Sequence, residues 1–566
     1  MTKRLYHLIH WILVLTIATV VPAIGQDKGN TQSAANSGQE ITELKALLAD
    51  QQRQIQELRT ALQEQKKLIE SARQTGPEQG APPASPQSGT APLGQIASTT
   101  PIIPVAPAAR APLALPMPTA AAPQKAESAS MASPLQIHIG DATITPVGFM
   151  DFTTVFRSTN TGNGIGTNFG GVPFSNAPNG KLTELRESAQ NSRIGIRVDA
   201  NVKGARILGY MESDFLGAAP SNLPVTSNSD PLRLRLYWVD VRKNAFEVLA
   251  GQSWSMLTPN RTGLSALPGD IFYSQLMDTN YQLGLTWSRQ TQFRLIAHPN
   301  DQVAMGLSFE APEQYIGGTN GIGAVALPTA VATPYANQLD NGTTTLSAPN
   351  VHPDIIAKIA FDPKTSNGLH QHVEIAGLFR TFKVYNPTPG TYFDSHGYGG
   401  SANVNFELFK GFHVISNNFF SDGGGRYIMG QAPDLIVRGD GSLSPVHTGS
   451  SVDGIEIQAG KNALLFAYWG GVYIRKNLAI DPATGKYVGY GFGNQNRIIQ
   501  EPSFGIIPTF WKDPKYGALQ LILQYSYVSR NPWVVASGTP SSAHSNMIFA
   551  DLRYVLPGSA PTIIEK

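Results

Sequence analysis

The chain has 566 residues, of which 14% are charged and none is cysteine, and its formal net charge is +2. Soluble globular domains carry about 25% charged residues, so the low fraction favours a surface that meets lipid. The nearly neutral balance disfavours a nucleic-acid-binding protein, and a sequence without cysteine excludes disulfides, zinc–thiolate sites and a lipoprotein anchor. The length predicts at least two structurally distinct regions.

The N-terminus has the pattern of a secretory signal peptide. Two basic residues, Lys3 and Arg4, precede a short apolar run, and small residues follow the run up to Gly25. The run is shorter than the ~20 residues of a spanning helix, which disfavours the alternative of a membrane anchor. We expect cleavage after Gly25, which removes residues 1–25 and leaves a polar segment at 26–39.

The next region, residues 40–71, repeats apolar side chains every seven positions. The repeat places Ile41, Leu48, Ile55, Leu62 and Ile69 at position a, and Leu44, Gln51, Leu58 and Gln65 at position d. This spacing predicts a coiled coil and therefore self-association, with a lone amphipathic helix as the alternative. Isoleucine at a and leucine at d favour a dimer, but the two glutamines weaken that preference, so a trimer stays open. Residues 72–135 are rich in Pro and Ala and predict an extended linker.

From residue 136 onward, apolar and polar side chains alternate with a period of two. In the clearest case, 518–530, Leu519 and Leu521 alternate with Gln520. Such segments are about ten residues long, which suits a tilted transmembrane strand. We expect strands at 143–157, 192–200, 204–215, 232–242, 245–254, 280–288, 291–298, 302–310, 353–362, 370–382, 398–409, 412–420, 452–460, 463–474, 502–511, 518–530 and 548–556.

The connections between these segments alternate between tight turns and long loops. Tight turns are expected at 201–203, 289–290 and 410–411, and long loops at 158–190, 217–231, 311–352, 421–451 and 475–500. Short turns on one side and long loops on the other are typical of outer-membrane barrels. Single-chain bacterial barrels have an even number of strands, so we expect about 16 strands and one wrong assignment among the predicted segments.

A soluble β-sandwich or propeller at the cell surface, with its oily face inward, is the alternative fold. Aromatic residues near strand ends, such as Trp469 and Tyr473, favour the barrel because transmembrane barrels carry aromatic girdles at both interfaces. We therefore predict an all-β fold in which residues 136–566 form a transmembrane antiparallel β-barrel. It would lie in the lipid of the Gram-negative outer membrane, preceded by a short α-helical coiled coil in the periplasm.

The polar faces of the predicted strands are rich in basic side chains. The candidates for a pore-lining, anion-binding wall are Arg193, Arg197, Arg206, Arg233, Arg235, Lys358, Arg380, Arg530 and Arg553. The first five fall on three consecutive predicted strands. Guanidinium groups in a narrow lumen would concentrate anions and offer bidentate sites to carboxylates or phosphates. We expect a passive channel for small hydrophilic, preferably anionic, solutes.

The alternative is that acidic residues of the same faces neutralise these cations. The candidate counter-charges are Asp151, Asp199, Glu212, Asp214, Asp354 and Glu374. Paired charges would solvate the lumen or orient a solute without selecting anions. The long loop 311–352 is the candidate to fold into the lumen as a constriction, and an exposed extracellular loop is its alternative.

No part of the sequence assembles a nucleophile, a base and an orienting group, so we expect no enzyme, no catalytic residue and no cofactor. The Gly-rich stretches 161–171 and 317–323 lack the strand-to-helix context of a dinucleotide site and predict loops. His370 and His372 would share one face of a strand and could form a weak metal site. A solvated turn explains them better, and no metal is expected.

Several strings resemble the DcaP-like porin family of outer-membrane channels. They are YMESDFLG (210–217), AGQSWSML (250–257), HPDIIAKIAFD (352–362), AGLFR (376–380) and GGGRYIMGQ (423–431). The order of signal peptide, periplasmic coiled coil and barrel is also similar. The resemblance implies a homotrimer rather than a dimer, and uptake of small anionic solutes such as dicarboxylates. A structural tether, acting through the coiled coil and the linker, is the second class of function that the sequence leaves open.

Overall fold

The computed structural model describes residues 135–217, 230–271, 274–319, 321–342 and 352–558. The predicted signal peptide, polar segment and coiled coil, and all of the linker except its last residue, lie outside the described residues. Within the described ranges, no helix is long and apolar enough to cross a membrane.

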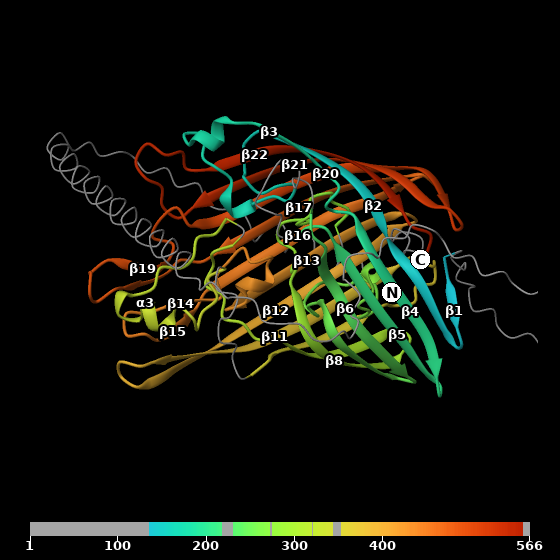
Figure 1. The fold of residues 1–566 in the computed structure, drawn as a ribbon, viewed down its shortest axis with the longest axis horizontal. Coiled ribbons are helices and arrows are strands. Elements are labelled where there is room, and N and C mark those ends of the chain that lie inside the picture. Colours follow the sequence, from blue (N-terminus) through green and yellow to red (C-terminus); the bar gives the residue numbers. More distant parts are fainter. Residues whose placement is uncertain (1–134, 218–229, 272–273, 320, 343–351, 559–566) are drawn as a thin grey trace, which may run out of the picture. The chain divides into compact units, whose positions relative to one another are not determined.

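Sixteen antiparallel strands close into one barrel (Figure 1). They are β2 (Ala142–Arg157), β4 (Arg193–Val202), β5 (Ala205–Asp214), β6 (Arg233–Lys243), β7 (Phe246–Trp254), β8 (Arg289–Asn300), β9 (Val303–Glu310), β10 (Asp354–Phe361), β11 (Gln371–Asn386), β12 (Thr391–Phe409), β13 (Phe412–Asp422), β16 (His447–Ala459), β17 (Ala463–Ile474), β20 (Asn496–Asp513), β21 (Gly517–Pro532) and β22 (Ala543–Val555). Each strand pairs with the next of this series, and β22 pairs with β2 to close the ring. The predicted fold class and strand number are confirmed.

Short strands, one short helix and several 3-10 turns lie outside the sixteen barrel strands. β1 (Ile137–Ile139) and β3 (Glu184–Ser188) pair with the edges of β2. The long loops carry β14 (Leu435–Val437), β15 (Leu443–Pro445), β18 (Asn477–Ile480), β19 (Tyr487–Tyr490), the helix α3 (Thr329–Tyr335) and the 3-10 turns Phe169–Gly171, Pro178–Lys181, Pro268–Asp270 and Gly425–Tyr427. We call the end of the barrel that bears these loops the loop end, and the opposite end the short-turn end.

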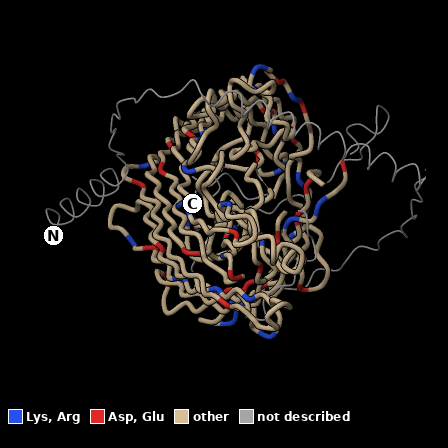
Figure 2. The backbone as a smooth tube through the Cα atoms, turned by 90° about the vertical axis from the view of Figure 1, so that its left-hand side faces the viewer, with Lys and Arg blue, Asp and Glu red and all other residues tan. Residues whose placement is uncertain are grey.

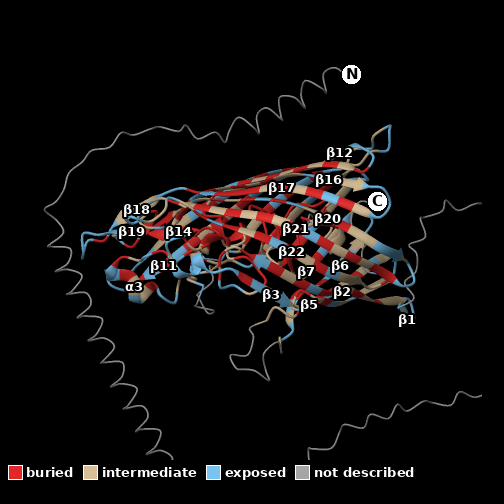
Figure 3. Ribbon diagram, turned by 90° about the horizontal axis from the view of Figure 1, so that it is seen from above, coloured by how far each residue is buried: buried red, intermediate tan, exposed pale blue. Residues whose placement is uncertain are grey.

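The direction in which the apolar side chains point decides between a transmembrane barrel and a soluble β-sandwich. On β21, Gln520 and Gln524 are 6% and 3% exposed and face inward, whereas Leu523 is 40% exposed and faces outward. Alternating buried and exposed blocks run along the strands (Figure 3). A sandwich would bury the leucine and expose the glutamines, so the outward oily face is that of a transmembrane barrel.

One predicted strand is wrong. Residues 280–288 are part of a long loop between β7 and β8, and the tight turn predicted at 289–290 lies within β8. Tyr281 has a φ of 62°, in the left-handed region that a non-glycine residue of an extended strand does not adopt. The alternation of apolar and polar residues in this sequence is not matched by alternating burial, because residues 281–287 are all buried. Removing this segment leaves the even number of strands.

Candidate functional site: the barrel lumen

The loop that joins β7 to β8 folds into the barrel, and we call its residues 255–288 the luminal loop. Near its start, the backbone N–H of Asn260 donates to Glu374 of β11 at 3.2 Å. Arg261 pairs with Glu456 of β16 at 2.7 Å, and these two side chains are 3% and 0% exposed. The start of the luminal loop is therefore fixed to one side of the wall by buried polar contacts.

The end of the luminal loop contacts strands farther round the wall. The backbone N–H of Leu283 donates to Glu501 of β20 at 2.8 Å, and Arg193 of β4 donates to the hydroxyl of Tyr281. In the strand order, β4 lies nearly opposite β11. Seen along the barrel, loop segments lie inside the ring of strands (Figure 2). The luminal loop thus crosses the lumen.

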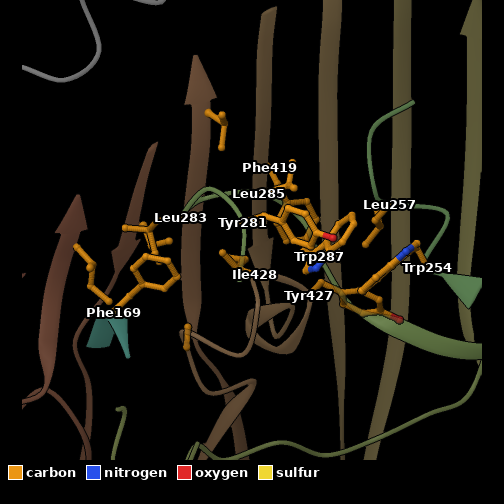
Figure 4. Close-up of a cluster of buried hydrophobic side chains, with 14 of the residues drawn as sticks. Phe169, Trp254, Leu257, Tyr281, Leu283, Leu285, Trp287, Phe419, Tyr427 and Ile428 are labelled. Carbon is orange, nitrogen blue, oxygen red and sulfur yellow. The ribbon is translucent and has the colours of Figure 1, made fainter. Parts of the chain in front are cut away.

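Apolar side chains of the luminal loop form a core inside the barrel (Figure 4). The ring of Trp287 stacks on that of Trp254 with 3.7 Å between centroids and meets Tyr281 edge-on at 4.7 Å. Phe419 of β13 and Tyr427 of the following loop belong to the same cluster and are 1% and 0% exposed. The inward face, which the sequence predicts to be polar, is therefore apolar in this part of the barrel.

The loop 311–352, which the sequence offers as a constriction, packs in its described parts among the other long loops. The backbone N–H of Tyr315 donates to Asp434, in the loop after β13, at 3.1 Å. The hydroxyl of Thr329 donates to Asp481, in the loop after β17, at 2.6 Å. These contacts place the described part of the loop at the loop end, whereas the luminal loop crosses the lumen.

The first five arginines of the predicted wall lie on three neighbouring strands, because β4 pairs with β5 and β5 with β6. Arg235 contacts Glu212 at 2.8 Å and Asp214 at 2.6 Å. Arg233 contacts Asp214 at 2.8 Å, and Arg193 lies 3.6 Å from Glu212. The predicted counter-charges therefore do pair with the wall.

The other two arginines of the wall are more open to solvent. Arg197 holds Asp199 with two hydrogen bonds, at 2.7 and 2.8 Å, and Arg206 lies 3.7 Å from the same carboxylate. Their side chains are 31% and 56% exposed. Both lie toward the short-turn end. Counting Asp240 and Arg242, which also face inward on β6, these strands set six guanidinium groups against four carboxylates, so pairing leaves an excess of positive charge.

Comparisons with known proteins bear on the architecture. No protein-family model matches the chain, and no curated protein matches it in sequence. The barrel is similar to outer-membrane channels of known structure. The outer membrane channel DcaP of Acinetobacter baumannii matches with a TM-score of 0.52 at 16% identity, over 73% of this chain and 97% of that one. An anion-selective porin from Comamonas acidovorans matches with a TM-score of 0.42 at 10% identity, over 73% of this chain and 99% of that one.

OmpF of Salmonella typhi matches with a TM-score of 0.40 at 8% identity, over 74% of this chain and all of that one. At 16% identity, the likeness to DcaP establishes the fold alone. That fold is the one implied by the resemblance to the DcaP-like porins.

Three further cations of the predicted wall hold loops in this channel fold. Lys358 contacts Glu374 at 2.8 Å and donates to the backbone oxygen of Thr258, in the luminal loop, at 2.9 Å. Arg530 donates to the backbone oxygen of Val172 at 2.6 Å. The side chain of Lys358 is 0% exposed, so these contacts connect the loops to the wall and leave Lys358 closed to a solute.

Arg380 is the third of these cations, and it is 0% exposed. It contacts Asp354 and Asp434 at 2.8 Å each. Arg426, from the loop after β13, also contacts Asp354, at 2.7 Å. Burial raises the pKa of Asp434, against the opposing effect of Arg380 and Arg426. This ion network ties the loop end to β10 and β11.

The last cation of the predicted wall, Arg553 on β22, completes the row of arginines. It contacts Asp151 of β2 at 2.7 Å, and its side chain is 18% exposed. The ring of Phe149 lies between two guanidinium groups, 4.1 Å from that of Arg553 and 5.1 Å from that of Arg193. Basic groups therefore continue from β22 through β4 to β6.

His370 and His372, the two histidines weighed as a weak metal site, contact groups around the start of the luminal loop. The two ring nitrogens of His372 contact Asp362 at 2.8 Å and Glu374 at 3.2 Å, whereas His370 contacts the backbone oxygen of Arg261 at 2.8 Å. The part of the chain that the structure describes holds no cluster of three or more His, Asp or Glu side chains arranged for a metal. Both histidines instead belong to the anchor of the luminal loop.

Sequence reasoning missed the residues that anchor the luminal loop. Arg261 and Glu456 are 195 positions apart, and Arg261 lies in a loop, where no period of two marks it. Gly263 donates through its backbone N–H to Asp362 at 2.9 Å, a contact that no side chain of residue 263 marks in the sequence. The only available signal was the even-number rule, which required that one predicted strand be a loop.

Proposed function

We propose that this chain is a porin of the Gram-negative outer membrane, a passive channel for small hydrophilic solutes with a preference for anionic ones such as dicarboxylates. The observation that carries the proposal is the arginine wall on β4, β5 and β6, in which guanidinium groups outnumber carboxylates. The barrel fold and its outward oily face support the membrane location. A homotrimer, held by the predicted coiled coil, is the proposed assembly.

The arrangement of the wall suits passage rather than tight binding. Arg197 and Arg206 keep a large exposed fraction while sharing Asp199. An excess of fixed positive charge in a low-dielectric lumen raises the local concentration of anions. A solute carboxylate would exchange with Asp199 as a partner of these guanidinium groups, and no covalent step, cofactor or metal is part of the proposal.

Liposome swelling tests this function. The full chain is reconstituted into liposomes, which are placed in isotonic solutions of a dicarboxylate, a neutral diol and a diamine of similar size. We expect swelling with all three and the fastest swelling with the dicarboxylate, because the wall attracts anions. No swelling with any solute, or fastest swelling with the diamine, would contradict the proposal.

The double variant Arg197→Gln, Arg206→Gln should bring the rates for the dicarboxylate and the diol together. The matched control is Lys243→Gln, which removes a positive charge from the exposed, outward end of β6. The control should leave the order of rates unchanged.

A further inference from the structure

A group of basic and aromatic side chains lies on the rim of the loop end, where β17, β20 and β21 meet the loops. Tyr473, near the end of β17, faces outward and is 43% exposed. Lys476 follows β17, Arg497 is the second residue of β20, and Trp533 follows β21. Lys476 and Arg497 are exposed, and Trp533 is half-buried. We call these four residues the rim cluster.

The indole ring of Trp533 is the centre of the rim cluster. The Nζ of Lys476 lies 5.1 Å from its centroid, and the guanidinium carbon of Arg497 lies 5.8 Å from it. The ring of Tyr473 meets that of Trp533 edge-on, with 6.4 Å between centroids. The face of an aromatic ring attracts a cation within about 6 Å of its centre. One ring therefore brings two like charges together.

Contacts with the loops fix the position of this ring. The Nε1 of Trp533 donates to the backbone oxygen of Ile474 at 3.1 Å, and its backbone N–H donates to that of Gln495 at 2.9 Å. A Cβ added to Gly491 would lie 3.1 Å from the ring and 2.9 Å from the Cγ of Lys476. The backbone at Gly491 thus packs against both side chains. The rim cluster is in place before a ligand arrives.

The two cations of the rim cluster have no carboxylate partner. Among the residues that the structure describes, neither Lys476 nor Arg497 forms an ion pair, whereas the arginines of the luminal wall do. On the neighbouring strands β13 and β16, Asp422 contacts His447, so that carboxylate has a basic partner of its own. Arg475, which is exposed beside Lys476, adds a third positive charge. The rim cluster therefore offers its charge to an anion from outside the barrel.

The level of the rim cluster is that of a membrane–water interface. Transmembrane barrels carry aromatic girdles at both interfaces, and their longer loops are extracellular. Toward the middle of the barrel, Phe504 of β20 faces outward and is 58% exposed, so the surface below the rim cluster is apolar. A lipid whose acyl chains cover this apolar surface would place its headgroup beside Lys476 and Arg497.

We propose that the rim cluster binds the phosphate group of an anionic lipid in the leaflet on the loop side of the membrane. Arg497 would donate hydrogen bonds to two phosphate oxygens, and Lys476 would add a point charge. The rings of Trp533 and Tyr473 would lie against the lipid where its headgroup meets its chains. A free phosphate ion carries the same charge but has no chains to cover the apolar surface, so the lipid is the ligand.

This inference rests on the proposed location in the outer membrane, but not on the selectivity of the lumen. Its test counts bound lipid, whereas the swelling test reads the passage of solute. Removal of the two rim cations should leave the swelling rates unchanged, because the rim cluster lies outside the lumen. The two proposals can therefore fail separately.

Native mass spectrometry of the full chain in a nonionic detergent tests the proposal. The protein is mixed with dioleoyl phosphatidic acid, which carries a phosphate monoester, or with dioleoyl phosphatidylcholine, whose headgroup has no net charge. We expect phosphatidic acid to bind at concentrations at which phosphatidylcholine does not. The double variant Lys476→Gln, Arg497→Gln should raise the concentration of phosphatidic acid that gives half occupancy by about fivefold or more.

The matched control is the double variant Lys203→Gln, Lys461→Gln. It removes two exposed lysines from the tight turns at the short-turn end, so the change in net charge is the same. Its occupancy by phosphatidic acid should equal that of the natural chain. The shift of the unheated band in gel electrophoresis reports whether each barrel is folded.

Two results would overturn the proposal. One is equal occupancy by phosphatidic acid in the natural chain and in Lys476→Gln, Arg497→Gln, which would show that the lipid binds elsewhere. The other is displacement of the lipid by inorganic phosphate at an equal concentration, which would show that the rim cluster takes a free anion. We expect inorganic phosphate to displace the lipid only in large excess.

Substitution of Trp533 provides an independent measurement. Trp533→Leu removes the ring that gathers the cations but keeps both charges, so a purely electrostatic surface would bind as before. We expect Trp533→Leu to weaken the binding of phosphatidic acid by about threefold or more, and Trp533→Phe to retain most of the affinity. Unchanged binding by Trp533→Leu would contradict a site built around the ring.

Discussion

The two ends of the lumen are built from the same strands but in different ways. On β11, the inward residues toward the loop end include Leu378, Phe382 and Val384, which are 4%, 0% and 1% exposed under the folded loops. On β4 and β5, toward the short-turn end, Arg197 and Arg206 are 31% and 56% exposed. An inward position therefore faces either a packed core or water, depending on whether a loop covers it.

This difference assigns two roles to the buried and exposed charges of the lumen. The hydrogen bonds of Arg380, Lys358 and Arg261 join loops to the barrel wall. Arg197 and Arg206 keep side-chain surface that a solute can reach. Buried ion pairs leave an uncompensated charge when one partner is removed, at a cost of about 3–5 kcal/mol. Exposed pairs contribute about 0–1 kcal/mol. Substitution of a buried charge should therefore change how firmly the loops are held. Substitution of Arg197 or Arg206 should change the selectivity of the channel.

The largest effect is expected from Arg380→Ala. This change leaves Asp354 and Asp434 without a cation that now lies 2.8 Å from each, so the loop end should be destabilised by about 3–5 kcal/mol. Limited proteolysis of the reconstituted protein should show cleavage in the loops that follow β9 and β13 while the barrel fragment survives. A cleavage pattern identical to that of the natural chain would show that Arg380 does not hold the loops.

The next effect is expected from Arg261→Ala, which releases the start of the luminal loop from Glu456. The loop crosses the lumen, so its release should widen the pathway, and we expect the single-channel conductance to rise about twofold or to fluctuate between levels. The control is Lys364→Ala, which removes an exposed pair with Asp301 of 3.3 Å and should leave conductance unchanged. An identical conductance for Arg261→Ala and Lys364→Ala would show that the luminal loop does not limit the pathway.

The smallest effect on conductance is expected from deletion of residues 40–135, the predicted coiled coil and linker. A channel formed by the barrel should keep its single-channel conductance within experimental error, because both ends of the lumen lie in the described barrel. A structural tether would instead lose its cellular phenotype. Loss of conductance in the deleted protein would contradict the assignment of the pathway to the barrel.

The strands could be predicted because lipid on one side and the lumen on the other impose a period of two. The same period misled at 280–288, since the apolar and the polar side chains of residues 281–287 are all buried within a loop. The gathering of the arginines from Arg193 to Arg235 on β4, β5 and β6 followed from the order of the strands. The pairing of Arg261 with Glu456 did not, because contacts over 195 positions depend on how the luminal loop crosses the barrel.

The reversal potential of the full chain in a planar bilayer, under a gradient of potassium chloride, tests the central claim most directly. The account predicts anion selectivity, and a shift toward zero when Arg197 and Arg206 are both replaced by glutamine. Cation selectivity in the natural chain, or a reversal potential that the double replacement leaves unchanged, would contradict the claim that the exposed arginines make the channel prefer anions.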